Sequence, residues 1–483
     1  MGSEIPRLRM FFFPFLAYGH MIPAVDMAKL FGSRGVKTTI ITTPANALLI
    51  SKSIQMNKHL GIEIDVKIIK FPSGEAGLPE GCENLDAISN IVEMAAKFLK
   101  ATTLLREPLE ELLGECKPDC LVADMFFPWA TAAAAKFGIL SLVFHGTSFF
   151  SLCTSACLVQ YQPHKKVSSD SEPFVVPNLP GDIKLTRKQV PDFLQEDGET
   201  GFTMLWKDIQ QADITSFGTL VNSFYELEPA YADHYRKVLG RRSWHVGPLS
   251  LCNRNVEDKA LRGKQASIDE HECLKWLNSK KPNSVIYVCF GSLANFSSAQ
   301  LMELALGLEA SGQQFIWVVR KNKNAEEEKE DWLPEGFEKR MEGRGLITRG
   351  WTPEVLILDH EALGGFVTHC GWNSTLEGVT AGVPMVTWPV FAEQFYNEKL
   401  VTEVLKIGTA VGVQQWSRVG GDFVKREAVE KVVKEVPVGD KAEEMRIRAK
   451  ALGQMAKRAV EKGGSSYTDL NAFIEELSSQ RRN

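Results

Sequence analysis

Two residues far apart in the sequence, His20 and Asp124, have the types and positions expected of a proton-transfer pair. Each follows or ends a short apolar run typical of a buried strand, residues 8–15 for the histidine and 120–124 for the aspartate. An imidazole titrates near neutral pH, so it can remove the proton from a hydroxyl that is otherwise a poor nucleophile. A carboxylate on its other ring nitrogen would fix the tautomer and stabilise the imidazolium. The pair therefore indicates activation of a hydroxyl, although both residue types at strand ends often have structural roles.

A second group of residues, later in the chain, has the features of a diphosphate site. Residues 365–368 form a predicted buried strand that leads into His369 and a Cys-Gly turn. A helix is expected to start behind the turn, with Asn373 or Ser374 as its N-cap. Such a helix start offers free N–H groups and a partial positive charge, which favour a phosphate.

Two neighbouring residues suit the nucleoside that would carry this diphosphate. Glu377 lies one helical turn further on, where a carboxylate could accept both ribose hydroxyls. Trp351 offers a flat apolar face for stacking a base. Each residue alone is weak evidence, because most tryptophans are core residues and most histidines are structural. Their order along one segment predicts a nucleotide site.

Both groups are positioned by a β–α alternation that restarts in the second half of the chain. This pattern predicts parallel sheets with helices on both faces and ligands at the carboxyl ends of the strands. Strands are expected at residues 8–15, 38–42, 62–69, 120–124, 140–144, 219–223, 284–290, 314–319, 346–348, 365–368 and 385–388. Helices are expected at residues 21–33, 85–113, 128–137, 202–212, 299–311, 374–381 and 391–405.

The restart predicts an α/β protein of two Rossmann-like domains that face a shared cleft. The first domain is assigned to residues 1–246 and the second to residues 266–460. Residues 247–265 lack periodicity and are the predicted linker, and a helix within residues 461–483 is expected to pack back on the first domain. Residues 322–331 are almost entirely charged or polar and are predicted to form a solvated loop.

The composition excludes several classes of protein. The net charge is −5, with basic residues spread among acidic ones, so no nucleic-acid partner is expected. The nine cysteines form no Cys-x-x-Cys pair, which argues against zinc or a disulfide framework and favours the cytoplasm. No apolar run reaches the roughly 18 residues of a membrane span. A monomer is the default expectation.

The segment THCGWNSTLE, residues 368–377, resembles the signature box of plant secondary-product glycosyltransferases, the UDP-sugar-dependent family 1 enzymes with the GT-B fold. The likeness extends over residues 351–394, and FPFLAYGH (13–20) and VAD (122–124) resemble the family's catalytic histidine and its partner aspartate. It implies that His20 deprotonates an acceptor hydroxyl, with Asp124 behind it, and that the acceptor attacks the anomeric carbon with inversion. The implied donor is UDP-glucose.

The resemblance also assigns the donor site residue by residue. It implies that Trp351 stacks on uracil and Glu377 binds ribose, while Glu393 and Gln394 hold the sugar hydroxyls. The complete set of predicted donor-binding residues is Gly19, Ser292, Trp351, Thr352, Glu354, His369, Trp372, Asn373, Ser374, Glu377, Glu393 and Gln394. No Asp-x-Asp motif is present, so neither a metal nor another cofactor is expected.

One position departs from the family pattern. Where the family usually has Trp-Ala-Pro-Gln, this sequence has Trp351, Thr352, Pro353 and Glu354. Glu354 lacks the amide donor of glutamine, which could weaken UDP binding. A solvent-facing glutamate without any role is an equally good interpretation.

The acceptor pocket is expected in the first domain, with one contribution from across the cleft. Its predicted lining residues are Tyr18, Phe126, Phe127, His145, Phe150 and Phe391. Aromatic walls suit planar or steroidal acceptors, and the related clade implies a flavonoid, another phenolic or a triterpenoid. Ordinary core packing is at least as good an explanation for each of these aromatic residues.

Two other functions remain as alternatives. A nicotinamide-dependent oxidoreductase would also use Rossmann-like halves, but it requires a Gly-x-Gly-x-x-Gly turn that neither His20 nor His369 has beside it. A non-catalytic UDP-sugar-binding protein would keep the nucleotide site and turn nothing over. The presence of both His20 and Asp124 argues against that alternative.

Overall fold

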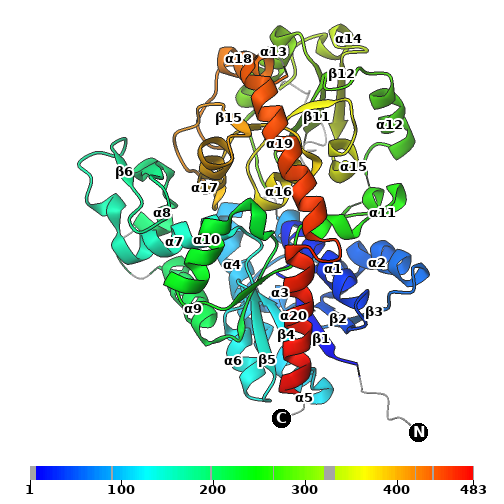
Figure 1. The fold of residues 1–483 in the computed structure, drawn as a ribbon, viewed down its shortest axis with the longest axis vertical. Helices are drawn as coiled ribbons and strands as arrows, with labels where there is room; N and C mark the ends of the chain where they lie inside the picture. The colour runs from blue at the N-terminus through cyan, green and yellow to red at the C-terminus, as the bar shows by residue number, and fades with distance from the viewer. Residues whose placement is uncertain are drawn as a thin grey trace.

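The chain folds into two halves, each built on one parallel sheet with helices packed around it (Figure 1). The computed structural model describes residues 7–88, 91–195, 198, 200–264, 266–319, 332–418, 420–437 and 440–481. The charged loop predicted at residues 322–331 lies outside these ranges. The predicted fold class, two Rossmann-like halves of α/β type, is confirmed.

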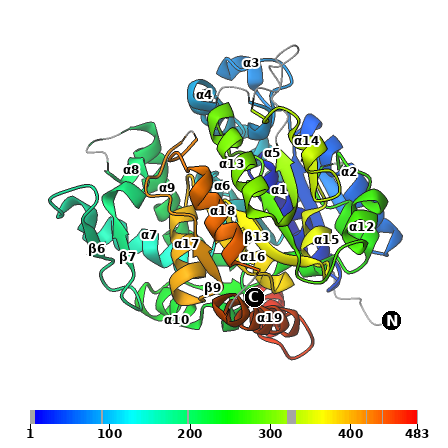
Figure 2. The ribbon, with the colours of Figure 1, turned by 90° about the horizontal axis from the view of Figure 1, so that it is seen from above.

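The first half contains a seven-stranded sheet whose paired strands are all parallel. In spatial order its strands are β3 (Ile64–Ile68), β2 (Lys37–Thr42), β1 (Arg9–Phe13), β4 (Cys120–Asp124), β5 (Leu140–Phe144), β8 (Gly218–Val221) and β9 (Ser243–His245). A separate hairpin of β6 (Pro173–Val175) and β7 (Lys184–Thr186) projects to one side of the body in both ribbon views (Figures 1 and 2).

The second half contains a six-stranded sheet, again parallel throughout. Its spatial order is β12 (Gly345–Arg349), β11 (Gln314–Val319), β10 (Val285–Cys289), β13 (Leu363–Thr368), β14 (Met385–Thr387) and β15 (Gly408–Ala410). The two central strands, β10 and β13, are buried along their whole length, as expected for a parallel sheet covered on both faces.

Each sheet has one point where the strand order reverses. In the first sheet the reversal falls between β1 and β4, and in the second between β10 and β13. A crevice opens at the carboxyl end of a parallel sheet at such a point, because the two connections leave in opposite directions. The predicted catalytic pair and the predicted diphosphate loop follow strands that border these two points.

Helices connect the strands in both halves. Those of the first half are α1 (Tyr18–Gly32), α2 (Pro44–His59), α3 (Ser73–Ala76), α4 (Ile91–Leu104), α5 (Arg106–Cys116), α6 (Trp129–Ala135), α7 (Phe149–Tyr161), α8 (Asp192–Gln195), α9 (Gly201–Thr215) and α10 (Pro229–Asp233). Those that follow are α11 (Val256–Ala260), α12 (Glu270–Asn278), α13 (Ser298–Ser311), α14 (Phe337–Arg340), α15 (Glu354–Leu358), α16 (Trp372–Ala381), α17 (Gln394–Lys399), α18 (Arg426–Glu435), α19 (Asp440–Ala459) and α20 (Ser465–Gln480).

Two sequence predictions about these helices are wrong in detail. The single helix expected at residues 85–113 is broken between α4 and α5, because Pro108 has no N–H to continue the hydrogen-bond ladder. The helix expected at residues 391–405 consists of α17 and a π-helical turn over Leu400–Val404. Strands β6, β7, β9 and β15, of three residues each, were not predicted.

The linker and the C-terminal helices both contact the two halves and connect them. Residues 247–264 lie between the halves and pack on α1, with Lys29 Nζ 2.9 Å from Asp258 Oδ2. Helix α19 crosses the second half, and α20 continues over the first half (Figure 1). There the ring of Phe473 lies 4.9 Å from that of Trp244, centroid to centroid, so the last helix completes the core of the first half.

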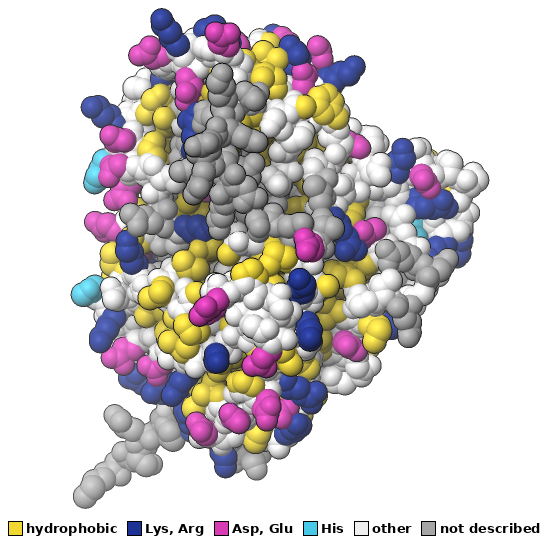
Figure 3. Space-filling model, turned by 180° about the vertical axis from the view of Figure 1, so that it is seen from behind, with side chains coloured by type: hydrophobic (Ala, Val, Ile, Leu, Met, Phe, Trp, Pro, Cys, Tyr) yellow, Lys and Arg dark blue, Asp and Glu magenta, His cyan; other side chains and the backbone are white. Residues whose placement is uncertain are grey.

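On the face seen in Figure 3, basic and acidic side chains are interspersed over both halves. Among the helices of the described residues, none combines the length and the apolar character needed to cross a bilayer.

Candidate active site

His20 and Asp124 meet at the reversal point of the first sheet. The Nδ1 atom of His20 lies 2.7 Å from Oδ2 of Asp124, whose side chain is fully buried while that of the histidine is 24% exposed. The backbone N–H of Phe126 donates to the other carboxylate oxygen at 3.1 Å and fixes its orientation. His20 lies in the first turn of α1, which begins at Tyr18, three residues earlier than the helix start predicted from the sequence. An ionised Asp124 keeps the ring proton on Nδ1, so Nε2 is the nitrogen that can accept a proton.

Three carboxylates influence the charge of this imidazole. Burial alone would lower the pKa of His20, but Asp124, through its charge and its hydrogen bond, together with Glu393 and Asp86 raises the pKa above the usual 6.5. Asp86 was not predicted from the sequence. It lies in a short 3-10 turn, where it accepts the N–H of Tyr18 at 2.8 Å, and no local pattern marks it as part of the site.

The raised pKa of His20 predicts an acid limb in the pH dependence of activity. Only the neutral imidazole accepts a proton, so activity is present above its pKa and lost as the pH falls through it. We expect kcat/KM for the acceptor to decline with an apparent pKa above 6.5. Initial rates at saturating donor across the acid range measure this limb. A decline centred below 6.5 would contradict the arrangement.

The loop between β13 and α16 forms a cradle for an anion. Cys370 adopts a positive φ of 65°, Gly371 is the N-cap, and no side chain caps the helix. The prediction that Asn373 or Ser374 is the N-cap is therefore wrong, because both already belong to the first helical turn. The N–H groups of that turn are left without a capping side chain, which suits a phosphate.

His369 is packed between Gly371 of this cradle and Gly291 of the loop after β10. A Cβ atom added at Gly291 would lie 2.7 Å from the His369 ring, and one at Gly371 only 2.5 Å from it. Burial lowers the pKa of His369 to about 4, so the ring is neutral at neutral pH and offers one donor and one acceptor. Within the described part of the chain, the buried atoms Nδ1 of His369, Oδ1 of Asn373 and Nε1 of Trp351 have no hydrogen-bond partner. Such orphaned polar atoms fit a site that binds a polar ligand.

Glu354 is engaged in the interior rather than turned to solvent. Its Oε1 accepts the hydroxyl of Ser374 at 2.7 Å, and its Oε2 accepts that of Tyr287 at 3.3 Å. The Tyr287 hydroxyl also lies 2.8 Å from Oγ1 of the buried Thr352. The Ser374 hydroxyl is therefore already used, and a phosphate at this point would be met by the backbone N–H of Ser374.

This geometry predicts the effect of restoring glutamine at position 354. Glu354→Gln keeps an oxygen for the Ser374 hydroxyl and removes one negative charge beside Glu377 and the anion cradle. We expect UDP to bind about 2- to 5-fold more tightly, the size of one unit charge at about 10 Å in a partly solvated site. Calorimetric titration with UDP measures the change, and weaker binding would show that the carboxylate itself is required.

The two reversal points face each other directly. Nδ2 of Asn373 donates to the carbonyl of Gly19 at 2.6 Å, which joins the anion cradle to the residue beside His20. Nε1 of Trp372 donates to the Asn222 carbonyl at 2.8 Å, so this side chain, predicted to bind the donor, is a buried contact between the halves. The imidazole and the helix tip therefore lie at the junction of the two halves, where a crevice is expected at the carboxyl ends of the strands.

The residues predicted to bind the sugar lie beside this crevice. Glu393 is near enough to His20 to raise its pKa, and its own carboxyl has a raised pKa because it is buried. Oε1 of Gln394 accepts the N–H groups of Val390 at 2.8 Å and Phe391 at 3.0 Å. Gln394 can thus offer its amide N–H groups to a sugar. Ser292 is half-buried in the loop that follows β10.

The predicted acceptor residues separate into different environments. The ring of Phe126, which is half-buried, lies 5.6 Å from that of His20, and Phe391 is also half-buried. Tyr18 lies on the nucleotide side instead, with its ring 5.8 Å from that of Trp351. His145 is buried, with Nε2 2.7 Å from Oδ1 of Asp213.

Phe127 and Phe150 require a correction. Phe127 is 1% exposed and stacks on Phe13 at 4.1 Å, and Phe150 is fully buried with its ring 4.7 Å from that of Tyr231. Both fill the core, so the prediction that they contact an acceptor is wrong. Adjacent aromatic residues in a loop look alike in sequence, and only the packing distinguishes Phe126 from Phe127.

Comparisons with a family model, with related sequences and with solved structures all point to the same family of proteins. A model of the family described as UDP-glucoronosyl and UDP-glucosyl transferase matches residues 86–439. The sequence is 62% identical to the scopoletin glucosyltransferase of Nicotiana tabacum over 98% of both proteins. It is 57% identical to the UDP-glucose flavonoid 3-O-glucosyltransferase 7 of Fragaria ananassa, over 98% of this chain and 96% of the relative. The crystal structure of Glycyrrhiza uralensis UGT73P12, complexed with glycyrrhetinic acid 3-O-monoglucuronide, is similar with a TM-score of 0.91 and 43% identity, over 98% and 96% of the two chains.

Proposed function

This chain belongs to the UDP-glycosyltransferase family, and on that premise we propose that it transfers glucose from UDP-glucose to a hydroxyl of a small aromatic or apolar plant metabolite. The observation that carries the proposal is the hydrogen bond from Asn373 to Gly19. It joins a base held by a carboxylate to an anion cradle in one crevice.

The reaction follows from the chemistry of these groups. Nε2 of His20 removes the proton of the acceptor hydroxyl, while Asp124 stabilises the imidazolium that forms. The acceptor oxygen bonds to the anomeric carbon as the bond from that carbon to the UDP oxygen breaks, so the configuration inverts. The charge that develops on the leaving diphosphate is met by the N-terminus of α16 and by His369.

The remaining donor contacts are proposed from the positions of the side chains. Trp351 and Glu377 would hold the uracil and ribose, and Glu393 and Gln394 the glucose hydroxyls. Because the helix tip already compensates the diphosphate, we expect no metal or other cofactor to be required. The same rate with and without a chelator of divalent cations would support this. A monomeric, cytoplasmic enzyme stays a prediction.

The acceptor class is proposed from the site and from the relatives together. The half-buried ring of Phe126 lies 5.6 Å from that of His20, which suits a flat apolar acceptor beside the base. The buried ring of Phe15 packs behind Phe126, with the two centroids 4.6 Å apart. One relative is named for scopoletin, another for a flavonoid, and a related structure contains a glycyrrhetinic acid glucuronide. Phenolic hydroxyls are therefore our first choice and triterpenoid hydroxyls our second.

Turnover with a mixed library tests this function. The protein is incubated with UDP-glucose, UDP-galactose, UDP-xylose or UDP-glucuronate and a mixture of coumarins, flavonoids and sapogenins, and products are identified by mass. We expect hexose additions from UDP-glucose. Binding of UDP-glucose without any product would instead support a non-catalytic UDP-sugar-binding protein.

A further inference from the structure

Arg262, in the linker, has no role in the mechanism above, and it is the centre of a buried group of charges that includes Glu377. Its Nε donates to Oδ2 of Asp26 at 2.7 Å, and its Nη1 donates to Oε1 of Glu377 at 2.5 Å. The exposed fractions of the three side chains are 11% for Arg262, 4% for Asp26 and 7% for Glu377. Asp26 belongs to α1 of the first half and Glu377 to α16 of the second. One guanidinium therefore joins the linker to both halves of the enzyme.

The residues around Arg262 touch the predicted nucleoside site as well. Gly263 has a φ of 97°, and a Cβ atom there would lie 2.4 Å from the ring of Trp351. Nζ of Lys264 lies 3.9 Å from the centre of the Tyr18 ring, which itself packs beside Trp351. Three consecutive linker residues thus contact Glu377, Trp351 and Tyr18. The conformation of the linker is coupled to the surface on which a base and a ribose would lie.

We propose that Arg262 is a positioning residue for the donor: anchored on Asp26, it holds the Glu377 carboxyl group in the orientation that receives the ribose hydroxyls and favours its charged form. This inference rests on the proposed function and adds to it a residue outside the signature segment. Arg262 itself need not touch the nucleotide.

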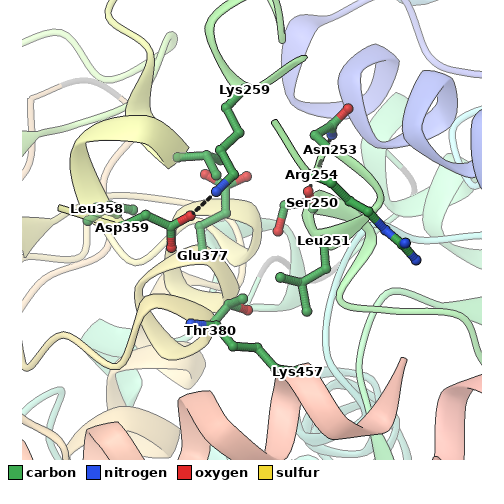
Figure 4. Close-up of a pocket in the computed structure, with 11 residues that line it drawn as sticks. Ser250, Leu251, Asn253, Arg254, Lys259, Leu358, Asp359, Glu377, Thr380 and Lys457 are labelled. Atoms are coloured by element: carbon green, nitrogen blue, oxygen red, sulfur yellow. Dashed lines mark hydrogen bonds and ion pairs between the residues drawn. The ribbon is translucent and has the colours of Figure 1, made fainter. Parts of the chain in front are cut away.

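The electrostatics explain why Glu377 needs such a partner. Burial, together with the charges of Glu354 and Asp26, raises the pKa of its carboxyl to about 8, and Arg262 is the group that opposes this rise. A neutral carboxyl is a weaker acceptor for two hydroxyls than a carboxylate. Glu377 also borders a cavity of about 210 Å³ between the linker and helices α15, α16 and α19, shown in Figure 4. A side chain beside open space needs a fixed partner to keep one orientation.

A neighbouring ion pair provides a matched control. Lys29 Nζ of α1 lies 2.9 Å from Asp258 Oδ2 and 3.2 Å from Asn253 Oδ1, so it fastens the same linker to the same helix. Lys29 is as buried as Arg262 but has no hydrogen bond to Glu377 among the contacts described. Arg262→Met and Lys29→Met therefore both loosen the linker, and only the first deprives Glu377 of its cation.

The test compares donor and acceptor kinetics of wild type, Arg262→Met, Arg262→Lys and Lys29→Met over a range of pH. For Arg262→Met we expect the KM for UDP-glucose to rise about 10- to 100-fold, the size of one lost charge-assisted hydrogen bond, with the acceptor KM unchanged. The pH below which donor binding weakens should shift upward, because Glu377 then ionises at higher pH. Arg262→Lys should restore part of the loss, and Lys29→Met should leave the pH dependence of the donor KM unmoved.

Several results would overturn the proposal. An unchanged donor KM in Arg262→Met would do so, as would equal effects of Arg262→Met and Lys29→Met on both KM values. In a Glu377→Gln background, Arg262→Met should have no further effect on donor KM, and an additional loss would show that Arg262 acts elsewhere. If Arg262→Met does not fold, Arg262→Lys takes its place in the test. An unchanged KM for UDP-glucose in Arg262→Lys would then overturn the proposal. Absence of turnover by the wild type would overturn the proposed function instead.

Discussion

Replacement of His20 by alanine is expected to lower kcat by about 10²- to 10⁴-fold while leaving the dissociation constant of UDP unchanged. The range is what one positioned general base contributes. The imidazole contacts Asp124 and the rings of Phe15 and Phe126, whereas the predicted diphosphate contacts come from the other half of the molecule. Loss of the base should therefore not disturb the nucleotide.

Steady-state rates measure kcat, and calorimetry with UDP on the same preparation measures the dissociation constant. His271→Ala is a suitable control, because this histidine is exposed on α12 and does not belong to the predicted site. We expect it to behave as wild type in both assays. Retained turnover in His20→Ala would remove His20 from the role of base, and weakened UDP binding would show that it contributes to the donor site.

Replacement of Asp124 by asparagine is expected to lower kcat by as much as about 10⁴-fold, the loss seen when a catalytic histidine is held in the wrong tautomer. An asparagine oxygen can still accept the Phe126 N–H, so the loop should keep its shape. Its amide group would then donate to Nδ1 of His20. The ring proton would move to Nε2, the nitrogen that must accept the proton of the acceptor.

A further histidine–aspartate pair, distinct from His145 and Asp213, serves as the control. Nδ1 of His245 lies 2.8 Å from Oδ2 of Asp469, where α20 packs on the first half. Asp469→Asn makes the same chemical change away from the crevice, so we expect reduced thermal stability and a nearly normal kcat per folded enzyme. If Asp124→Asn lowered only stability and Asp469→Asn lowered kcat, the catalytic assignment of Asp124 would be wrong.

The sequence predicted much of the fold because hydrophobic periodicity is a local property. Strands such as Cys120–Asp124 and Gln314–Val319 were placed at their observed bounds, since a buried parallel strand is a continuous apolar run between polar ends. The β–α alternation then fixed the class of the fold. Predictions failed where the signal was short or where a tertiary contact set the boundary, as at β9 and at the N-cap of α16.

The donor site could be predicted because its residues lie in one contiguous segment, whereas the other sites combine residues from distant segments. The signature segment holds His369, Asn373 and Glu377 within nine residues, so their spacing alone suggested a nucleotide. Asp86 and Arg262 come from an irregular turn and a linker, where no period or motif marks a residue as functional. The aromatic acceptor candidates failed in part for the same reason, because burial of Phe127 and exposure of Phe126 depend on which core each ring meets.

By itself, the sequence determined the parallel α/β class, the two halves, and the kinds of side chains that can act as a base or bind a nucleotide diphosphate. The tertiary structure decided which of these groups meet: the strand order brings His20 to Asp124, and the approach of the two halves brings Asn373 to Gly19 and Arg262 to Glu377. The physical reason is that side-chain type and periodicity are encoded along the chain. Partnership between residues more than a hundred positions apart is set by packing, and burial then sets their charge.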